Sequence, residues 1–157
     1  MSDLIWKPHV TVAAIAERDG AYLLVEELNS LGEKVINQPA GHLEEGESLV
    51  EACIRETMEE TGWMFKPEAL VGIYRWISPR DGETFLRYTF SGQLGEQISP
   101  EPLDGAILRT RWLSLEQLEN SSHQLRCVLV TRCIDDYLNG ARYPLTLLSD
   151  VLEPSIA

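Results

Sequence analysis

The sequence has few cysteines, few basic residues and no long apolar run. Its three cysteines, Cys53, Cys127 and Cys133, contain no C-x-x-C spacing, so neither a disulfide framework nor a zinc site is predicted. No apolar run approaches the ~20 residues of a membrane helix, and the first eight residues lack the basic and apolar regions of a signal peptide. We therefore expect a cytoplasmic protein that does not contact a membrane.

Basic residues are scarce relative to acidic ones. There are 13 Lys and Arg residues against 25 Asp and Glu residues, which gives a formal net charge of −12. A charge of this sign repels a phosphate backbone, so polymeric nucleic acid is not an expected partner. The acidic residues are concentrated in residues 41–63, where seven glutamates and one arginine account for half of the net charge of the chain.

What is present is the pattern of one mixed α/β domain over residues 1–157. A chain of 157 residues with 44% hydrophobic positions can bury one full core. Helices are predicted at 49–61, just after Ser114 and at 125–139, and 93–105 is predicted as a loop. Strands are predicted at 10–15, 22–28, 34–38, 70–77, 84–90 and 107–113, with the first two paired. This order predicts an α/β (α+β) sandwich, with a mixed central sheet and helices on both faces.

The helix over 49–61 has the clearest signals. Ser48 and Glu51 form a capping-box pattern at its start, and Gly62 is a left-handed stop at its end. At 100° per residue, one side of this helix is expected to face the core. That side carries Val50, Cys53, Ile54, Thr57 and Thr61.

The same helix carries Glu56, Glu59 and Glu60 at spacings i, i+3 and i+4. This spacing places the three carboxylates within about 100° of arc, where like charges repel one another. A divalent cation with oxygen ligands would relieve the repulsion, and Mg²⁺ binds through few carboxylates while keeping positions for water and substrate phosphate. The alternative interpretation is an acidic helix face that is simply solvated.

The residues around the three glutamates favour the metal-binding interpretation over a solvated acidic face. The segment reads Gly41, five residues, Glu47, seven residues, then 55–63 as Arg-Glu-Thr-Met-Glu-Glu-Thr-Gly-Trp. It resembles the Nudix box, G-x5-E-x7-R-E-U-x-E-E-x-G-U with U aliphatic, and matches all seven strictly typed positions. A chance match over this chain is on the order of one in 10⁶. Thr57 and Trp63 occupy usually aliphatic positions, and we expect the Thr57 hydroxyl to bond back to the Cys53 carbonyl.

The resemblance implies a Nudix hydrolase, which cleaves phosphoanhydride bonds with Mg²⁺, or with Mn²⁺ in its place. It implies that the glutamates of the helix both bind the metal and take part in catalysis, with Glu56 or an acid on a later loop as the general base. The implied metal ligands are Glu56, Glu59, Glu60 and the backbone carbonyl of Ala40 or Gly41.

The resemblance also assigns residues around the metal ligands. Glu47 and Arg55 are implied to be structural, as an ion pair that holds the loop from Gly41 to Glu47 against the helix. Glu101 and Asp104 lie where many family members place a further metal ligand or base, although solvated loop acids are equally compatible with the sequence.

Shorter strings at 7–13, 37–44, 85–87 and 142–145 resemble one bacterial phosphatase subfamily. It implies removal of terminal phosphate from nucleoside tri- and diphosphates, and cleavage of hydroxymethylpyrimidine diphosphate and thiamine diphosphate. The partner is then a small-molecule diphosphate or nucleotide, and we expect a monomer or homodimer. The alternatives are a Nudix enzyme for nucleotide sugars or dinucleoside polyphosphates, and a non-catalytic Nudix-like module. Because every box glutamate is retained, catalysis is favoured.

Four residues outside the box are candidates for substrate binding: Gln38, Arg75, Arg87 and Trp76. The arginines are rare positive charges in an acidic protein and could clamp a phosphate, or could form surface ion pairs. Gln38 could bond a base or phosphate, or simply end its strand. Trp76, like Tyr88, could stack on a pyrimidine or belong to the core.

Overall fold

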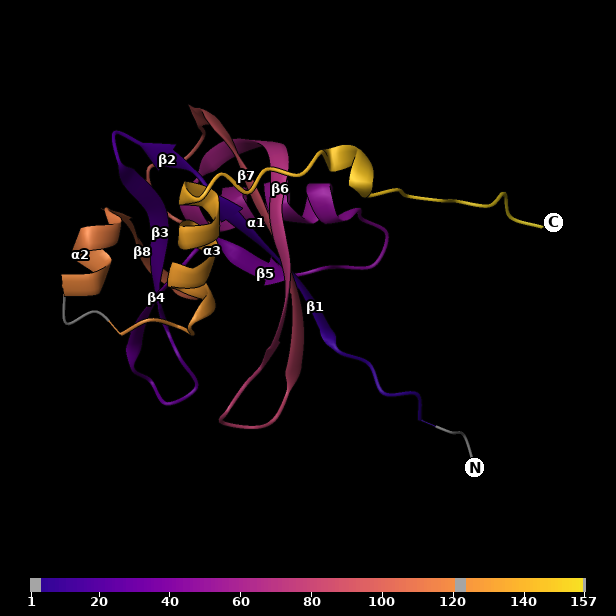
Figure 1. The fold of residues 1–157 in the computed structure, drawn as a ribbon, viewed down its shortest axis with the longest axis horizontal. Coiled ribbons are helices and arrows are strands. Elements are labelled where there is room, and N and C mark those ends of the chain that lie inside the picture. The colour runs from indigo at the N-terminus through magenta and orange to yellow at the C-terminus, as the bar shows by residue number, and fades with distance from the viewer. Residues whose placement is uncertain (1–3, 121–123, 157) are drawn as a thin grey trace.

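The computed structural model describes residues 4–120 and 124–156, so residues 1–3, 121–123 and 157 of the predicted domain lie outside the description (Figure 1). None of the described helices is long and apolar enough to cross a membrane. In chain order the elements are β1 His9–Ile15, β2 Glu17–Arg18, β3 Ala21–Leu28, β4 Lys34–Asn37, β5 Ala40–His42, α1 Leu49–Thr61, β6 Trp63–Ile77, β7 Thr84–Gln97, β8 Ile107–Leu113, α2 Leu115–Asn120, α3 Leu129–Leu138 and the 3₁₀ turn η1 Leu145–Leu147.

The strands form two sheets. The first has the order β5–β1–β7–β6 and is mixed, because β1 runs parallel to β7 while the other pairs are antiparallel. In the second sheet, β3 is the central strand and pairs in antiparallel fashion with β2, β4 and β8. The predicted mixed α/β fold is therefore confirmed, with its strands divided between two sheets.

The predicted pairing of the first two strands is wrong. Asp19 and Gly20 both have positive φ, 52° and 77°, as a tight hairpin requires. The hairpin that they close joins β3 to the two-residue strand β2, with Glu17 opposite Tyr22. The chain leaves β1 before this hairpin, so β1 is free to pair with β5 and β7 in the other sheet.

Helices cover both faces, as predicted, and each face has its own core. Successive residues of a strand point to opposite faces, so Leu23 joins one core while Tyr22 and Leu24 join the other. The core under α1 includes Val12, Ala14, Leu23, Ala52, Cys53, Leu70 and Phe90. The core under α3 includes Ile15, Leu24, Ile36, Val71, Leu113, Cys133 and Ile134.

Strands β6 and β7 are longer than predicted. Residues 93–97, predicted as loop, continue β7 as far as Gln97, and β6 begins directly after α1. The register shifts between Pro67 and Ala69, where a bulge accommodates the proline. Opposite this bulge, a Cβ on Gly92 would lie 2.0 Å from the Lys66 carbonyl oxygen. Proline and glycine here allow close strand approach and do not interrupt the sheet.

The last long helix is shorter than predicted, because α3 begins at Leu129 and not near 125. Leu125 instead forms a parallel bridge with Ile36, and the Arg126 N–H donates to the Ile36 carbonyl at 2.8 Å. Leu138, predicted on the apolar stripe, is 54% exposed. The start of this segment therefore pairs with β4, and residues 124–129 form part of the site described next.

Candidate active site

Local sequence fixes both ends of α1. The Ser48 hydroxyl accepts from the Glu51 N–H at 3.1 Å, and the Glu51 carboxylate accepts from the Ser48 N–H at 2.7 Å. Gly62 ends the helix at φ 74°. The Thr57 hydroxyl donates to the Cys53 carbonyl at 2.8 Å, as predicted. The buried face differs from the prediction, because Val50 and Ile54 are only half-buried, whereas Ala52 and Glu60 are buried.

Arg55 ties the loop before α1 to the helix. Its Nε and Nη2 donate to the two carboxylate oxygens of Glu47 at 2.9 and 2.7 Å, a bidentate ion pair. Its Nη2 also donates to the His42 carbonyl at 3.0 Å. The ion pair that the sequence predicts between Glu47 and Arg55 is present. It fixes the position of residues 41–47 relative to the carboxylates of α1.

The three helix carboxylates have different neighbours. Nη1 of Arg55 donates to Glu56 at 2.8 Å and to Glu59 at 3.3 Å. Glu60 has a different partner, since its Oε1 accepts from the Ala40 N–H at 2.7 Å. Within the described residues, no three His, Cys, Asp or Glu side chains are gathered around one point. Arg55 therefore offsets part of the charge of Glu56 and Glu59.

Glu60 is the most buried of the three, with 3% of its surface exposed. Burial raises its pKa to about 9, and the charges of Glu27, Glu56 and Asp104 act in the same direction, against the hydrogen bond from Ala40. The charged form of this carboxyl is therefore disfavoured without a cation.

Burial also raises the pKa of Glu56, although Arg55 opposes the shift. The Glu56 carboxyl group lies directly on Gly41, where an added Cβ would stand 2.1 Å from Cδ of Glu56. The buried carboxyl of Glu60 and the partly buried carboxyl of Glu56, both beside the backbone of residues 40–41, form a set of oxygen donors. Such a set suits a hard divalent cation.

The two loop acids predicted as further ligands lie in different surroundings. The Asp104 N–H donates to the Glu59 carbonyl at 2.8 Å, and the charge of Asp104 contributes to the raised pKa of both Glu56 and Glu60. Glu101 is exposed, and its N–H donates to the Ser99 hydroxyl at 3.3 Å. The structure thus brings Asp104 next to α1 and leaves Glu101 exposed.

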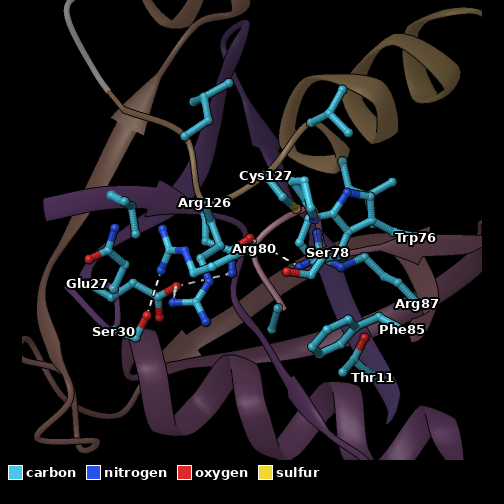
Figure 2. Close-up of a pocket in the computed structure, with 18 of the residues that line it drawn as sticks. Thr11, Glu27, Ser30, Trp76, Ser78, Arg80, Phe85, Arg87, Arg126 and Cys127 are labelled. Atoms are coloured by element: carbon cyan, nitrogen blue, oxygen red, sulfur yellow. Dashed lines mark hydrogen bonds and ion pairs between the residues drawn. The ribbon is translucent and has the colours of Figure 1, made fainter. Parts of the chain in front are cut away.

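A cavity of about 550 Å³ opens beside the loop that Arg55 holds. Ala40, Gly41 and His42 form part of its wall. Most of the residues labelled in Figure 2 fall into two groups. Trp76, Phe85 and Arg87 lie on one side of the cavity, and Glu27, Ser30, Arg80 and Arg126 lie on the other.

The predicted substrate-binding residues are only partly brought together. Arg87 and Trp76 line the cavity. Gln38 is 1% exposed and lies behind the wall, where its side chain donates to the Val130 carbonyl at 2.7 Å and accepts from Arg87 at 3.2 Å. Arg75, on β6, is exposed and does not line the cavity.

The residues on the second side of the cavity, Glu27, Ser30, Arg80 and Arg126, were not predicted from the sequence. Nη1 of Arg126 lies 3.4 Å from Oε1 of Glu27, and Nη1 of Arg80 donates to the Ser30 hydroxyl at 2.6 Å. These residues come from segments far apart in the chain. The scarcity of positive charge that singled out Arg75 and Arg87 applied equally to Arg80 and Arg126. Only the tertiary structure separates the arginines that line the cavity from Arg75.

The site therefore combines carboxylates on α1, which suit a divalent cation, with a neighbouring cavity whose wall carries arginines, which suit phosphate groups. The chain belongs to the NUDIX domain family, whose sequence profile matches residues 7–129. It is a Nudix hydrolase, as the box predicted.

Relatives agree with this assignment over nearly the whole chain. Phosphatase NudJ of Escherichia coli (strain K12) is 45% identical over 147 residues, which are 93% of this chain and 94% of that protein. The structure of a NUDIX hydrolase from Nitrosomonas europaea superposes with a TM-score of 0.88 at 48% identity, covering 92% of this chain and 98% of the other.

A more distant structure shares the fold. It is a bifunctional NMN adenylyltransferase/ADP ribose pyrophosphatase from Francisella tularensis, complexed with AMP and a Mn ion. The TM-score is 0.71 at 18% identity, over 88% of this chain and 43% of that protein.

Proposed function

We propose that this enzyme releases orthophosphate from nucleoside tri- and diphosphates and from small organic diphosphates such as hydroxymethylpyrimidine diphosphate and thiamine diphosphate, with Mg²⁺ as cofactor. The observation that carries the proposal is the pair of carboxyls formed by the buried Glu60 and the partly buried Glu56, beside a cavity with arginines on both sides. The likeness to a protein named Phosphatase NudJ supports release of orthophosphate.

The metal would be held by Glu56, Glu59 and Glu60 together with the carbonyl of Ala40 or Gly41. The hydrogen bond from the Ala40 N–H orients one oxygen of Glu60 and leaves the other for a ligand. Glu59 is half-exposed, so its carboxylate can turn to a ligand by exchanging Arg55. Mg²⁺, or Mn²⁺ in its place, would offset the charge of the diphosphate and activate water.

Within this site, Glu56 is the proposed general base. Arg55 donates to its Oε1 at 2.8 Å, which leaves Oε2 to take the proton of the attacking water. Asp104, whose backbone is bonded to α1, is the alternative base or a further ligand. Glu101 is a weaker candidate for either role because it is exposed and bonded to Ser99.

The cavity would bind the rest of the substrate. Arg87 and Trp76 line it, and Gln38 acts on the substrate through Arg87, whose guanidinium it holds at 3.2 Å. Arg75 could reach only a substrate that extends beyond the cavity. The protein has a net charge of −12, which repels anions. The arginines of the cavity wall would provide the local attraction for an anionic substrate.

Replacing Glu60 by glutamine tests the metal assignment. We expect a loss of at least ~10²-fold in turnover at saturating substrate and Mg²⁺, since a bound metal supplies several kcal/mol of transition-state stabilisation. Glu45→Gln is the matched control, because Glu45 is an exposed glutamate of the box at an untyped position. Near-normal turnover in Glu60→Gln, with circular dichroism unchanged, would remove Glu60 from the metal site.

Product analysis tests the bond that is cut. GDP, GTP and hydroxymethylpyrimidine diphosphate are incubated with enzyme and Mg²⁺, and the products are separated by ion exchange. We expect orthophosphate from all three. Pyrophosphate and GMP as the sole products of GTP, with GDP intact, would refute the phosphatase assignment. A nucleotide sugar and a dinucleoside polyphosphate are incubated in parallel, and hydrolysis confined to these two would favour the alternative pyrophosphohydrolase.

A further inference from the structure

Arg87 lies in a polar row that crosses the cavity face of the first sheet. The register of the sheet places Arg87 of β7 opposite Thr11 of β1, and Thr11 opposite His42 of β5. Residues directly opposite one another share a face of the sheet, and all three line the cavity. The row therefore runs from Arg87 to the loop at the start of the box.

An aromatic row lies beside it, two residues back along β7. Phe85 is opposite Trp76 of β6 and opposite His9 of β1. The ring centroids of Trp76 and Phe85 are 5.5 Å apart, and those of Phe85 and His9 are 4.8 Å apart with stacked planes. Because successive side chains on one face are about 7 Å apart along a strand, the aromatic row borders Arg87.

Arg87 is a buried cation with neutral partners. It is 7% exposed, and its Nη1 and Nη2 donate to the side-chain oxygens of Gln38 and Asn37 at 3.2 Å each. Among the residues that the structure describes, no carboxylate forms an ion pair with it. These two bonds fix the plane of the guanidinium and use two of its five N–H groups. Three N–H groups remain for a ligand in the cavity that Arg87 lines.

We propose that the cavity holds a planar heterocycle against Trp76 and Phe85, and that Arg87 reads the carbonyl edge of this ring, so that the enzyme prefers 6-oxopurine nucleotides to adenine nucleotides. The two adjacent acceptors of guanine, O6 and N7, match the arginine fork, whereas adenine presents an amino donor in place of O6. This inference rests on the proposed function and names the substrate class of that site.

The other side of the cavity is better suited to the phosphates. Arg126 and Arg80 are more exposed than Arg87, and their partners there are Glu27 and Ser30 (Figure 2). The charge of Glu27 also acts on Glu60. We therefore place the phosphate chain on this side, which is close enough to α1 for Glu27 to act on Glu60, and the ring on the aromatic side.

The wild-type enzyme gives the first test. We would measure kcat/KM with Mg²⁺ for GDP, IDP, 7-deaza-GDP and ADP by orthophosphate release. We expect GDP and IDP to be equivalent, because both present O6 and N7, and ADP to be ~10-fold poorer or worse. The 7-deaza analogue, which lacks one acceptor, should fall between them. Equal values for GDP and ADP would overturn the inference but leave the proposed phosphatase function standing. Absence of release from every substrate would instead refute that function.

The second test uses Arg87→Lys, which keeps the charge but loses the fork. We expect the ratio of GDP to ADP to fall towards one, mainly through KM for GDP. Arg132→Met, which removes an exposed arginine paired with Asp136, is the control and should keep the wild-type ratio. An equal loss for GDP and ADP in Arg87→Lys would show a phosphate clamp and overturn base reading. If Arg87→Lys does not fold, the wild-type analogue series decides alone.

Discussion

Replacing Glu60 by glutamine should stabilise the metal-free protein while it removes activity. Glu60 is 3% exposed, and burial raises its pKa from 4.5 to about 9. Between these two values the folded protein keeps the proton of Glu60, whereas the unfolded chain releases it. The free energy of unfolding of the wild type therefore falls as the pH rises from 4.5 to 9.

The size of the effect follows from the shift. At pH 7 the solution is 2.5 pH units above the unfolded value of 4.5. Each unit corresponds to about 1.36 kcal/mol, so the wild type loses up to roughly 3 kcal/mol at this pH. Glutamine is neutral and its oxygen can still accept from the Ala40 N–H. Glu60→Gln should therefore exceed the wild type in stability by up to that amount at pH 7, and match it near pH 4.5.

Urea unfolding in the presence of a chelator, at pH values between 5 and 8, measures this difference. Glu59→Gln is the control, because Glu59 has a side chain that is 45% exposed and bonded to Arg55, so its variant should change little. Added Mg²⁺ should stabilise the wild type by mass action and leave Glu60→Gln unchanged. A stability difference in chelator that is absent, reversed or independent of pH would refute the desolvation reasoning.

Two further substitutions test how the box is held together. Gly41→Ala would place a methyl group 2.1 Å from Cδ of Glu56, so we expect a loss of kcat with the helical content preserved; unchanged kcat would show that the position of the Glu56 carboxylate is unimportant. Arg55→Met removes the bidentate pair with Glu47 and the bond to the His42 carbonyl, so we expect the free energy of unfolding to fall by about 3 kcal/mol. Urea titration measures this loss, and a change below about 1 kcal/mol would argue against a structural role.

The sequence by itself determined the features whose partners lie close along the chain. The bounds of α1 follow from Ser48, Glu51 and Gly62, each within one turn of the groups that it caps. The bond from Thr57 to Cys53 and the ion pair between Glu47 and Arg55 span four and eight residues. The strict spacing of the box was enough to identify the family, because a helix fixes the relative positions of its side chains whatever surrounds it.

Only the tertiary structure decided which groups are buried and which distant residues meet. The helical periodicity predicted one shared acidic face. It could not show that Glu60 accepts from the Ala40 N–H while Arg55 donates to Glu56 and Glu59. Likewise, the two sheets bring Arg87 to side chains 49 and 50 positions away in the sequence. Burial and long-range pairing depend on how whole strands are ordered in space, and a local pattern of residues carries no record of that order.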